Sequence, residues 1–232
     1  MAGRITALKT QLKNKQRINV YLDGVFALAL PDTVAASLRV GQPLSDDECA
    51  GLRRRDAEES AYSRALRFLG YRPRSTEEVA RHLAGLQVPE ELIAETVGRL
   101  GREGLLDDQA FARFWVENRE SFRPRGLAAL RYELRRKGIA EEAIDEATRE
   151  VDESAGAYRF AASQAERLRN VDRETFRRRL GGLLARRGFS YETVRETVDR
   201  LWRGRGAPTP TQGANKLRNE AEDDILSGKD LE

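Results

Sequence analysis

Two segments of the chain align without a gap at an offset of 51: PRSTEEVARHLAGLQVPEELIAETV, residues 73–97, and PRGLAALRYELRRKGIAEEAIDEAT, residues 124–148. A third, more diverged copy follows at an offset of 50, in which the matches are Leu130 with Leu180, Leu134 with Leu184, Gly138 with Gly188, Ile139 with Phe189 and Ile144 with Val194. A period of about 50 residues predicts stacked supersecondary units. Because such units present a long surface to a long partner, the repeat favours a binding protein over an enzyme.

Each copy reads as three helices, one before the Pro-Arg turn and two after it. Ser75, with Glu78 three residues later, is typical of a helix start. Gly138 and Gly188 suit left-handed positions at the end of the middle helix, whereas the first copy has Gln87 there, so we expect its turn to differ. The predicted fold is mainly α: three tandem three-helix modules in an elongated, curved array.

The N-terminal part of the chain predicts a small β meander. ITALKTQL, INVYLD and VFALAL are short runs with partial alternation, and Asp23-Gly24 between the last two is a strong hairpin signal. A meander alone is marginally stable, so its apolar face must rest on the helices that follow. Ser45 and Glu48 form a capping box at the start of the first long helix.

These patterns divide the chain into five parts. The expected boundaries are 1–44 for the β meander with a short helix, 45–106, 107–152 and 153–204 for the three helical repeats, and 205–232 for a disordered tail. The tail is polar and rich in Pro and Gly, which is typical of a segment that buries little apolar surface.

Composition excludes several classes of protein. The chain has one cysteine and one histidine, which leaves no disulfide framework and removes most zinc-based and histidine-based schemes. Lys and Arg number 41 against 38 Asp and Glu, a mild basic excess of +3. No apolar run is long enough for a membrane span, and the N-terminus lacks a signal-peptide core. We expect a cytoplasmic, monomeric protein with no cofactor, metal or membrane contact.

No catalytic constellation stands out. The sequence has neither a GxxxxGK[ST] phosphate loop nor a GxGxxG motif after a strand. Asp107 and Asp108 open a predicted helix, where capping explains them better than catalysis. We therefore expect no enzymatic activity.

Clusters of basic residues are the strongest candidates for a contact surface. Five clusters occur, at Arg53–Arg55, at Arg123 with Arg125, at Arg135–Lys137, at Arg177–Arg179 and at Arg186–Arg187. One interpretation is a set of solvated helices whose charges pair locally. The other is a basic stripe, because stacked repeats can bring Arg136, Arg179 and Arg187 to one side and offer them to phosphates or to an acidic protein.

The order of these motifs resembles that of the RecX family, bacterial regulators of the RecA recombinase. In that family a Pro-Arg-Ser turn precedes a Glu-rich helix, a Gly-Leu-Leu-Asp-Asp stretch opens the next module, and a pattern ending in Lys-Gly-Ile follows. This chain has the same three elements, at residues 73–75, 104–108 and 137–139. Further matches are Gly126, Leu130, Glu133 and Leu134. The resemblance covers residues 4 to about 203 and is weakest in the third copy.

The resemblance implies three tandem three-helix modules that bind the RecA filament on single-stranded DNA. It implies modulation, mostly inhibition, of ATP turnover, strand exchange and RecA-stimulated repressor cleavage, and hence restraint of recombination and of the SOS response. Direct contact with DNA fits the mixed charge of the chain. Arg74 and Arg125 match the family's Pro-Arg turn.

Seven basic residues are the candidate contact residues: Arg74, Arg123, Arg125, Arg136, Lys137, Arg179 and Arg187. All but Arg74 and Arg125 are chosen from charge and repeat position alone. Three alternatives remain open. They are a helical DNA-binding protein that acts without RecA, an enzyme, and a general helical scaffold.

Overall fold

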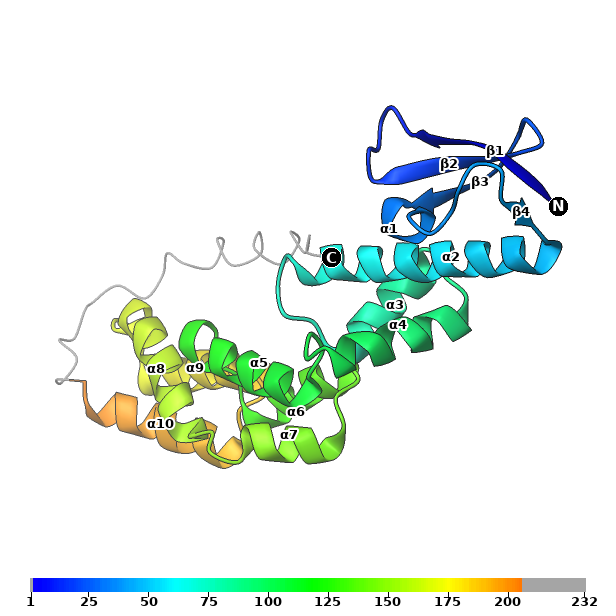
Figure 1. Cartoon of the computed structure of the whole chain (residues 1–232). Helices are drawn as coiled ribbons and strands as arrows, with labels where there is room; N and C mark the ends of the chain where they lie inside the picture. The colour runs from blue at the N-terminus through cyan, green and yellow to red at the C-terminus, as the bar shows by residue number, and fades with distance from the viewer. Residues whose placement is uncertain (1, 206–232) are drawn as a thin grey trace. The chain divides into compact units, whose positions relative to one another are not determined.

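The N-terminal part of the chain is a four-stranded antiparallel sheet. In this computed structural model, which describes residues 2–205, the strands are β1 (Gly3–Thr10), β2 (Arg17–Leu22), β3 (Val25–Pro31) and β4 (Pro43–Leu44), and α1 (Asp32–Ala35) follows β3. The sheet order is β3-β2-β1-β4 (Figure 1). The expected meander of three strands is confirmed, and a short fourth strand pairs with the start of β1.

The hairpin between β2 and β3 turns at the expected dipeptide. Asp23 and Gly24 both have positive φ angles, of 48° and 85°. This conformation matches the right-handed twist of the flanking strands, and Gly and Asp accept it at lower cost than most residues. Between β1 and β2, the side chain of Asn14 accepts a hydrogen bond from the backbone N–H of Gln16, which closes the other turn.

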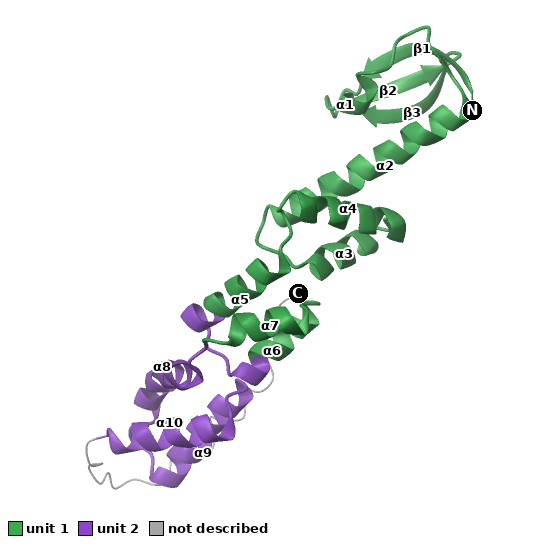
Figure 2. Ribbon diagram, turned by 60° about the horizontal axis from the view of Figure 1, so that its bottom comes forward, with its two compact units in different colours: residues 1–118, 130–150 green, residues 119–129, 151–232 purple. Residues whose placement is uncertain are grey.

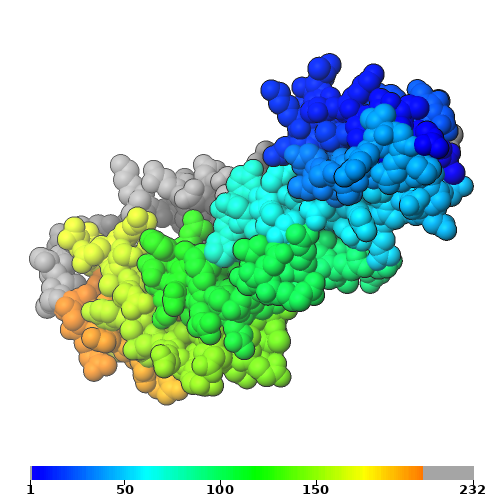
Figure 3. All heavy atoms as spheres, viewed as in Figure 1, coloured from blue at the N-terminus to red at the C-terminus, as the bar shows by residue number. Residues whose placement is uncertain are grey.

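The sheet rests on the long helix α2 (Asp46–Leu69). Strand residues that include Val20 and Leu30 are fully buried with Cys49 and Leu52 of α2, which form one core. An ion pair of 2.9 Å between Arg17 and Asp56 links β2 to the same helix. In the space-filling view, the atoms of the sheet (blue) and of α2 (cyan) meet in one continuous surface (Figure 3). The meander therefore gains the apolar cover that it lacks alone.

Ten α-helices account for most of the described residues. After α2 they are α3 (Thr76–Gly85), α4 (Glu90–Arg102), α5 (Asp108–Phe122), α6 (Leu127–Arg136), α7 (Glu141–Thr148), α8 (Glu153–Ala165), α9 (Arg173–Arg186) and α10 (Tyr191–Arg203), with a short 3-10 helix at Glu166–Leu168. They group as α2–α4, α5–α7 and α8–α10. The expectation of three three-helix repeats is confirmed.

Apolar side chains at helical spacing form the cores. In the first repeat, Ala65, Val79, Leu83 and Leu100 are fully buried together. In the third, Ala157, Ala161, Phe176, Leu180 and Leu184 do the same. In the second, Leu130, Leu134 and Ile144 are fully buried as well. The aligned apolar positions thus face inward in all three copies, as their spacing predicts.

The middle helix of every repeat ends in the same turn. Gln87, Gly138 and Gly188 have φ angles of 60°, 77° and 79°. In each case the N–H of the following residue bonds to the carbonyl five positions back: Val88 to Leu83, Ile139 to Leu134 and Phe189 to Leu184. The expectation that the first turn differs is wrong, because this hydrogen-bonding pattern holds Gln87 in the left-handed conformation that glycine adopts more readily.

By their internal packing the described residues form two compact units (Figure 2). Unit 1 comprises residues up to 118 and 130–150, and unit 2 comprises 119–129 and 151 onward. The division falls inside the second repeat, so the five-part boundaries stay a prediction. The predicted tail lies outside the described residues, except for Arg205. Within the described residues, no helix is long and apolar enough to cross a membrane.

Candidate functional site

In unit 1, the turn of the second repeat packs on the start of α3. The hydroxyl of Ser75 donates a hydrogen bond of 2.7 Å to the carbonyl of Lys137. A β-carbon added to Gly138 would lie 2.4 Å from Cβ of Glu77, far inside van der Waals contact. Gly138 therefore serves two purposes, a left-handed φ and a close approach to α3.

In unit 2, the turn of the third repeat also packs on the start of α6, one residue further along the helix than in unit 1. The backbone N–H of Gly126 donates a hydrogen bond of 3.0 Å to the carbonyl of Arg187. A β-carbon on Gly126 would lie 1.9 Å from the carbonyl oxygen of Gly188, and one on Gly188 would lie 2.5 Å from Cβ of Ala129. Gly126 aligns with Ser75, so a backbone donor here replaces a side-chain donor.

A carboxylate from the following repeat caps the helix at each of these contacts. Asp108 accepts a hydrogen bond of 2.8 Å from the N–H of Thr76, and Glu153 accepts one of 2.9 Å from the N–H of Leu127. Both satisfy donors that a helix start leaves without an intrahelical partner. Asp107 caps its own helix α5 through the N–H of Ala110, as the sequence predicts.

The two contacts differ in charge. In unit 1, Lys137 lies 2.9 Å from Glu78 and 4.0 Å from the ring centre of Trp115. Arg72 also contacts Glu78, at 2.8 Å. Burial would raise the pKa of Glu78, but the hydrogen bonds from Arg72 and Lys137 outweigh it and lower the pKa to about 2. The charge of Lys137 is therefore neutralised by an ion pair within the protein.

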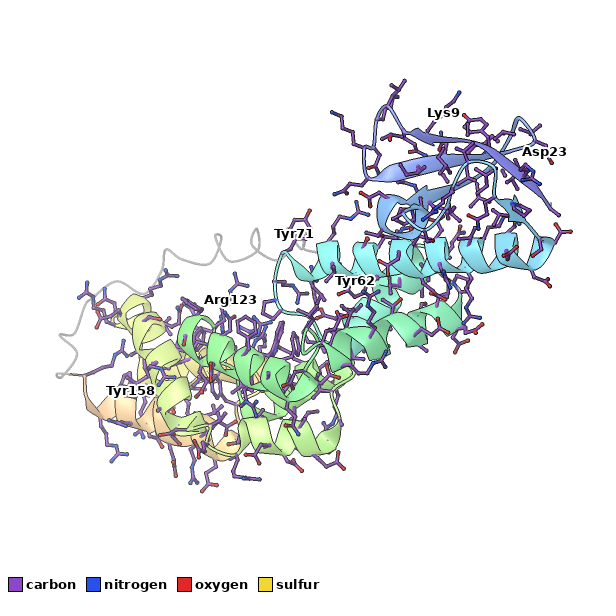
Figure 4. All side chains as sticks on the ribbon, in the orientation of Figure 1. Lys9, Asp23, Tyr62, Tyr71, Arg123 and Tyr158 are labelled. Carbon is purple, nitrogen blue, oxygen red and sulfur yellow. The ribbon has the colours of Figure 1, made fainter. Side chains whose placement is uncertain are left out.

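In unit 2, the equivalent cation meets other cations. Arg187 aligns with Lys137, but the position of Glu78 is taken by Ala129. Arg187 stacks on the ring of Phe160 at 4.0 Å and donates to a backbone carbonyl at 3.2 Å. Burial, followed by repulsion from Arg125 and Arg123, lowers the pKa of its guanidinium. We call Arg123, Arg125 and Arg187 the arginine cluster; Figure 4 labels Arg123 just after α5.

The remaining candidate residues lie elsewhere. Arg74 is in unit 1, where its guanidinium lies 3.8 Å over the ring of Phe68, and burial, followed by repulsion from Arg72, lowers its pKa. Arg136 and Arg179 are exposed, on α6 and α9. The structure thus brings together three of the seven predicted residues and engages a fourth, Lys137, in an interior ion pair.

One determinant of this site is not among the residues predicted from the sequence. The replacement of Glu78 by Ala129 between the first two copies leaves the second contact without the carboxylate that neutralises the first. The repeat alignment contains that signal, because the two positions are separated by the offset of the repeat. The replacement of Glu78 by Ala129 matters because Glu78 faces the next repeat, which only the folded structure shows.

The chemistry available to the arginine cluster is the binding of anions. Guanidinium groups that repel one another gain most when a phosphate or carboxylate joins them, and their forked donors match such groups. Within residues 2–205, no three His, Cys, Asp or Glu side chains gather in a way that could hold a metal ion. The feature that distinguishes the arginine cluster is its concentration of positive charge.

Family models match three parts of the chain. Residues 3–45 match the N-terminal domain of regulatory protein RecX, residues 61–100 match its first three-helix domain, and residues 107–147 match its second. These matches coincide with the sheet and with the first two helical repeats.

Individual proteins agree with the family models. The regulatory protein RecX of Bacillus subtilis is 31% identical over 202 residues, which are 85% of this chain and 76% of that protein. The regulatory protein RecX of Prosthecochloris aestuarii is 38% identical, over 61% of this chain and 93% of that protein. A crystal structure of regulatory protein RecX superposes with a TM-score of 0.68 at 28% identity and covers 86% of this chain and 100% of its own. This chain belongs to the RecX family of regulatory proteins.

Proposed function

We propose that this protein regulates the RecA recombinase by binding the RecA filament on single-stranded DNA. In that role it mostly inhibits ATP hydrolysis, strand exchange and RecA-stimulated repressor cleavage, and so restrains homologous recombination, DNA repair and the SOS response in the cytoplasm. Membership of the RecX family supports the choice of a regulatory function. No catalytic step by this chain is needed, because a bound protein can act by favouring one state of the filament.

The observation that supports the proposal is the clustering of Arg123 and Arg125 near Arg187, which is held on the ring of Phe160 and by the carbonyl of Pro124. A filament of protein and single-stranded DNA presents both phosphates and acidic side chains, and both are ligands for guanidinium groups. Arg123 is exposed at the end of α5, where it is accessible to such a partner. Arg179, exposed on α9, would extend the same contact within unit 2.

The first test is RecA ATP hydrolysis on single-stranded DNA, titrated with this protein from well below equal molarity. We expect inhibition at substoichiometric ratios. A lack of any effect on ATP hydrolysis, on strand exchange and on repressor cleavage would overturn the proposal.

Variants locate the contact. The double charge reversal R123E/R125E should weaken filament binding about tenfold or more at physiological salt, because each lost phosphate contact reduces affinity and its salt dependence. A129E would place a carboxylate at the position that aligns with Glu78, and should weaken binding by reducing the positive charge near Arg187. The control is R53E, which reverses an exposed arginine of α2 and should leave binding unchanged. Equal losses for all three variants would point to a nonspecific charge effect.

The arginine cluster also suits a second function, binding to single-stranded DNA without RecA. The same variants separate the two functions when DNA binding and RecA activity are measured side by side. Loss of DNA binding with unchanged regulation of RecA would favour the independent DNA-binding protein.

A further inference from the structure

In the second repeat, ion pairs join α6 to α7. Arg131 of α6 contacts both Glu141 and Asp145 of α7, the latter at 2.6 Å. Arg135 contacts Glu141, also at 2.6 Å. The two long side chains of α6 thus bridge the two helices.

The third repeat cannot form these bridges. At an offset of 50, Gly181 and Ala185 replace the two arginines, and Tyr191 and Arg195 replace the two acids. The result is an open hollow of about 490 Å³ between α9 and α10, lined by all four of these residues and by Val198. The loss of side chains on α9 opens the groove, and the loss of acids on α10 inverts its charge.

The composition of the hollow specifies its ligand. Arg177, Arg178 and Arg195 are exposed at its edge, and the one acid among the residues that line it is Glu174. Tyr191 is 78% exposed, which leaves a large amphipathic ring with little cover. Such a site fits a segment that presents several carboxylates next to aliphatic side chains. The arginines would form ion pairs with the carboxylates, and the apolar floor would pack against the aliphatic side chains.

The chain itself contains such a segment. Residues 219–226 read NEAEDDIL, with four carboxylates shortly before Ile225 and Leu226, and they lie outside the described residues. We propose that this acidic segment occupies the groove between α9 and α10 of the same molecule. The proposal concerns the chain alone and does not depend on the function proposed above.

The connecting chain is long enough. The hollow reaches Tyr191 at the start of α10, and that helix has 13 residues. A helix of this length rises about 20 Å. The chain from Arg205 to Glu220 can span up to about 50 Å when it is extended. Tethering also raises the effective concentration of the segment to the millimolar range, so a weak contact would be populated.

Photocrosslinking in the full-length protein tests this directly. Tyr191→p-benzoylphenylalanine places a crosslinker at the edge of the hollow, and the matched control is Tyr132→p-benzoylphenylalanine, at a tyrosine of α6 that is 60% exposed. Mass spectrometry should identify crosslinks to residues 219–226 about tenfold more often at position 191 than at 132, and raising the salt to about 1 M should reduce them.

Two further measurements make the result decisive. One variant neutralises the four acids of the segment (E220Q/E222Q/D223N/D224N), and a second reverses the charge of two arginines at the edge of the hollow (R178E/R195E). Each should reduce the crosslink about tenfold while the far-UV circular dichroism stays the same. Mixing heavy- and light-isotope chains should give crosslinks within one isotope class. Crosslinks between classes would mean that a second copy supplies the segment, and either that result or an absence of tail crosslinks would overturn the proposal.

Discussion

The contact on α3 in unit 1 and the contact on α6 in unit 2 share a backbone design but differ in charge. In both, the turn of the later repeat lies against the start of the earlier repeat's middle helix, and a carboxylate caps that helix. In unit 1, Glu78 neutralises Lys137. In unit 2, Ala129 stands at the place of Glu78, and Arg187 lies near two other arginines.

The two contacts differ in charge but not in the requirements for stable packing. A repeat contact needs close packing and satisfied donors, and both contacts have them. A buried ion pair is not required for that purpose, since hydrogen bonds and apolar packing can replace it. The second contact omits the pair and instead holds Arg187 on the ring of Phe160 beside Arg123 and Arg125, which is why we propose the functional site there.

Among the substitutions that probe these two contacts, Gly126→Ala should reduce the stability of the protein most. Its new β-carbon would meet the backbone of Gly188, which cannot move aside as a flexible side chain can. We expect a loss of about 3 kcal/mol or more in the free energy of unfolding, measured by urea denaturation. The control is Gly51→Ala in α2, where a β-carbon meets nothing within 4 Å. That change should stabilise the protein by about 0.5–1 kcal/mol. A neutral G126A would show that α6 and the turn at Gly188 are not in such close contact.

Glu78→Gln should break the charged contact in unit 1. Lys137 and Arg72 would lose their shared carboxylate while the shape of the side chain is kept. The side chains of Lys137 and Glu78 are only 16% and 15% exposed. We therefore expect a loss of about 2 kcal/mol, somewhat less than for a fully buried pair. Hydrogen exchange should localise the loss to α3 and α6. An unchanged exchange rate in both helices would contradict the prediction.

Acid should weaken the contact in unit 1 through the same carboxylate. The pKa of Glu78 is lowered from 4.5 to about 2 in the folded protein. Its contribution is therefore complete above about pH 4.5 and is lost as the pH falls towards about 2. Near pH 3 we expect the wild type to lose about 1–2 kcal/mol more than E78Q. The test is the difference between their denaturation curves across this range, and a difference that stays constant from pH 6 to pH 2.5 would rule the effect out.

Gln87→Gly should have the smallest effect. The left-handed turn of the first repeat has no earlier repeat to approach, so only its φ angle matters. Glycine relieves that strain but adds freedom to the unfolded chain, and the two effects should nearly cancel, within about 0.5 kcal/mol. The reverse change, Gly138→Gln, keeps the same turn but meets Glu77. It should cost about 2–3 kcal/mol. Equal effects of the two substitutions would show that the close approach is unimportant.

Much of the architecture could be predicted from the sequence. The repeat predicts three three-helix modules because apolar positions recur with helical spacing. The hairpin at Asp23-Gly24 and the capping boxes at Ser45 and Ser75 are local signals, and the structure confirms each of them. The first repeat's turn was missed because glycine at the end of a helix is a preference, whereas Gln87 can adopt the same conformation when the hydrogen bonds require it.

The family resemblance, the number of repeats and the excess of basic residues can all be read from the amino-acid sequence. Which of those basic residues form ion pairs within the protein becomes visible only in the folded chain, where Lys137 meets Glu78. Lys137 and Arg187 occupy equivalent positions in the repeat. Lys137 meets Glu78 only after folding, whereas the residue that aligns with Glu78 in the next repeat is Ala129. The interaction between two charges depends on the distance between them. When the two residues lie far apart in the chain, that distance cannot be read from a local sequence pattern.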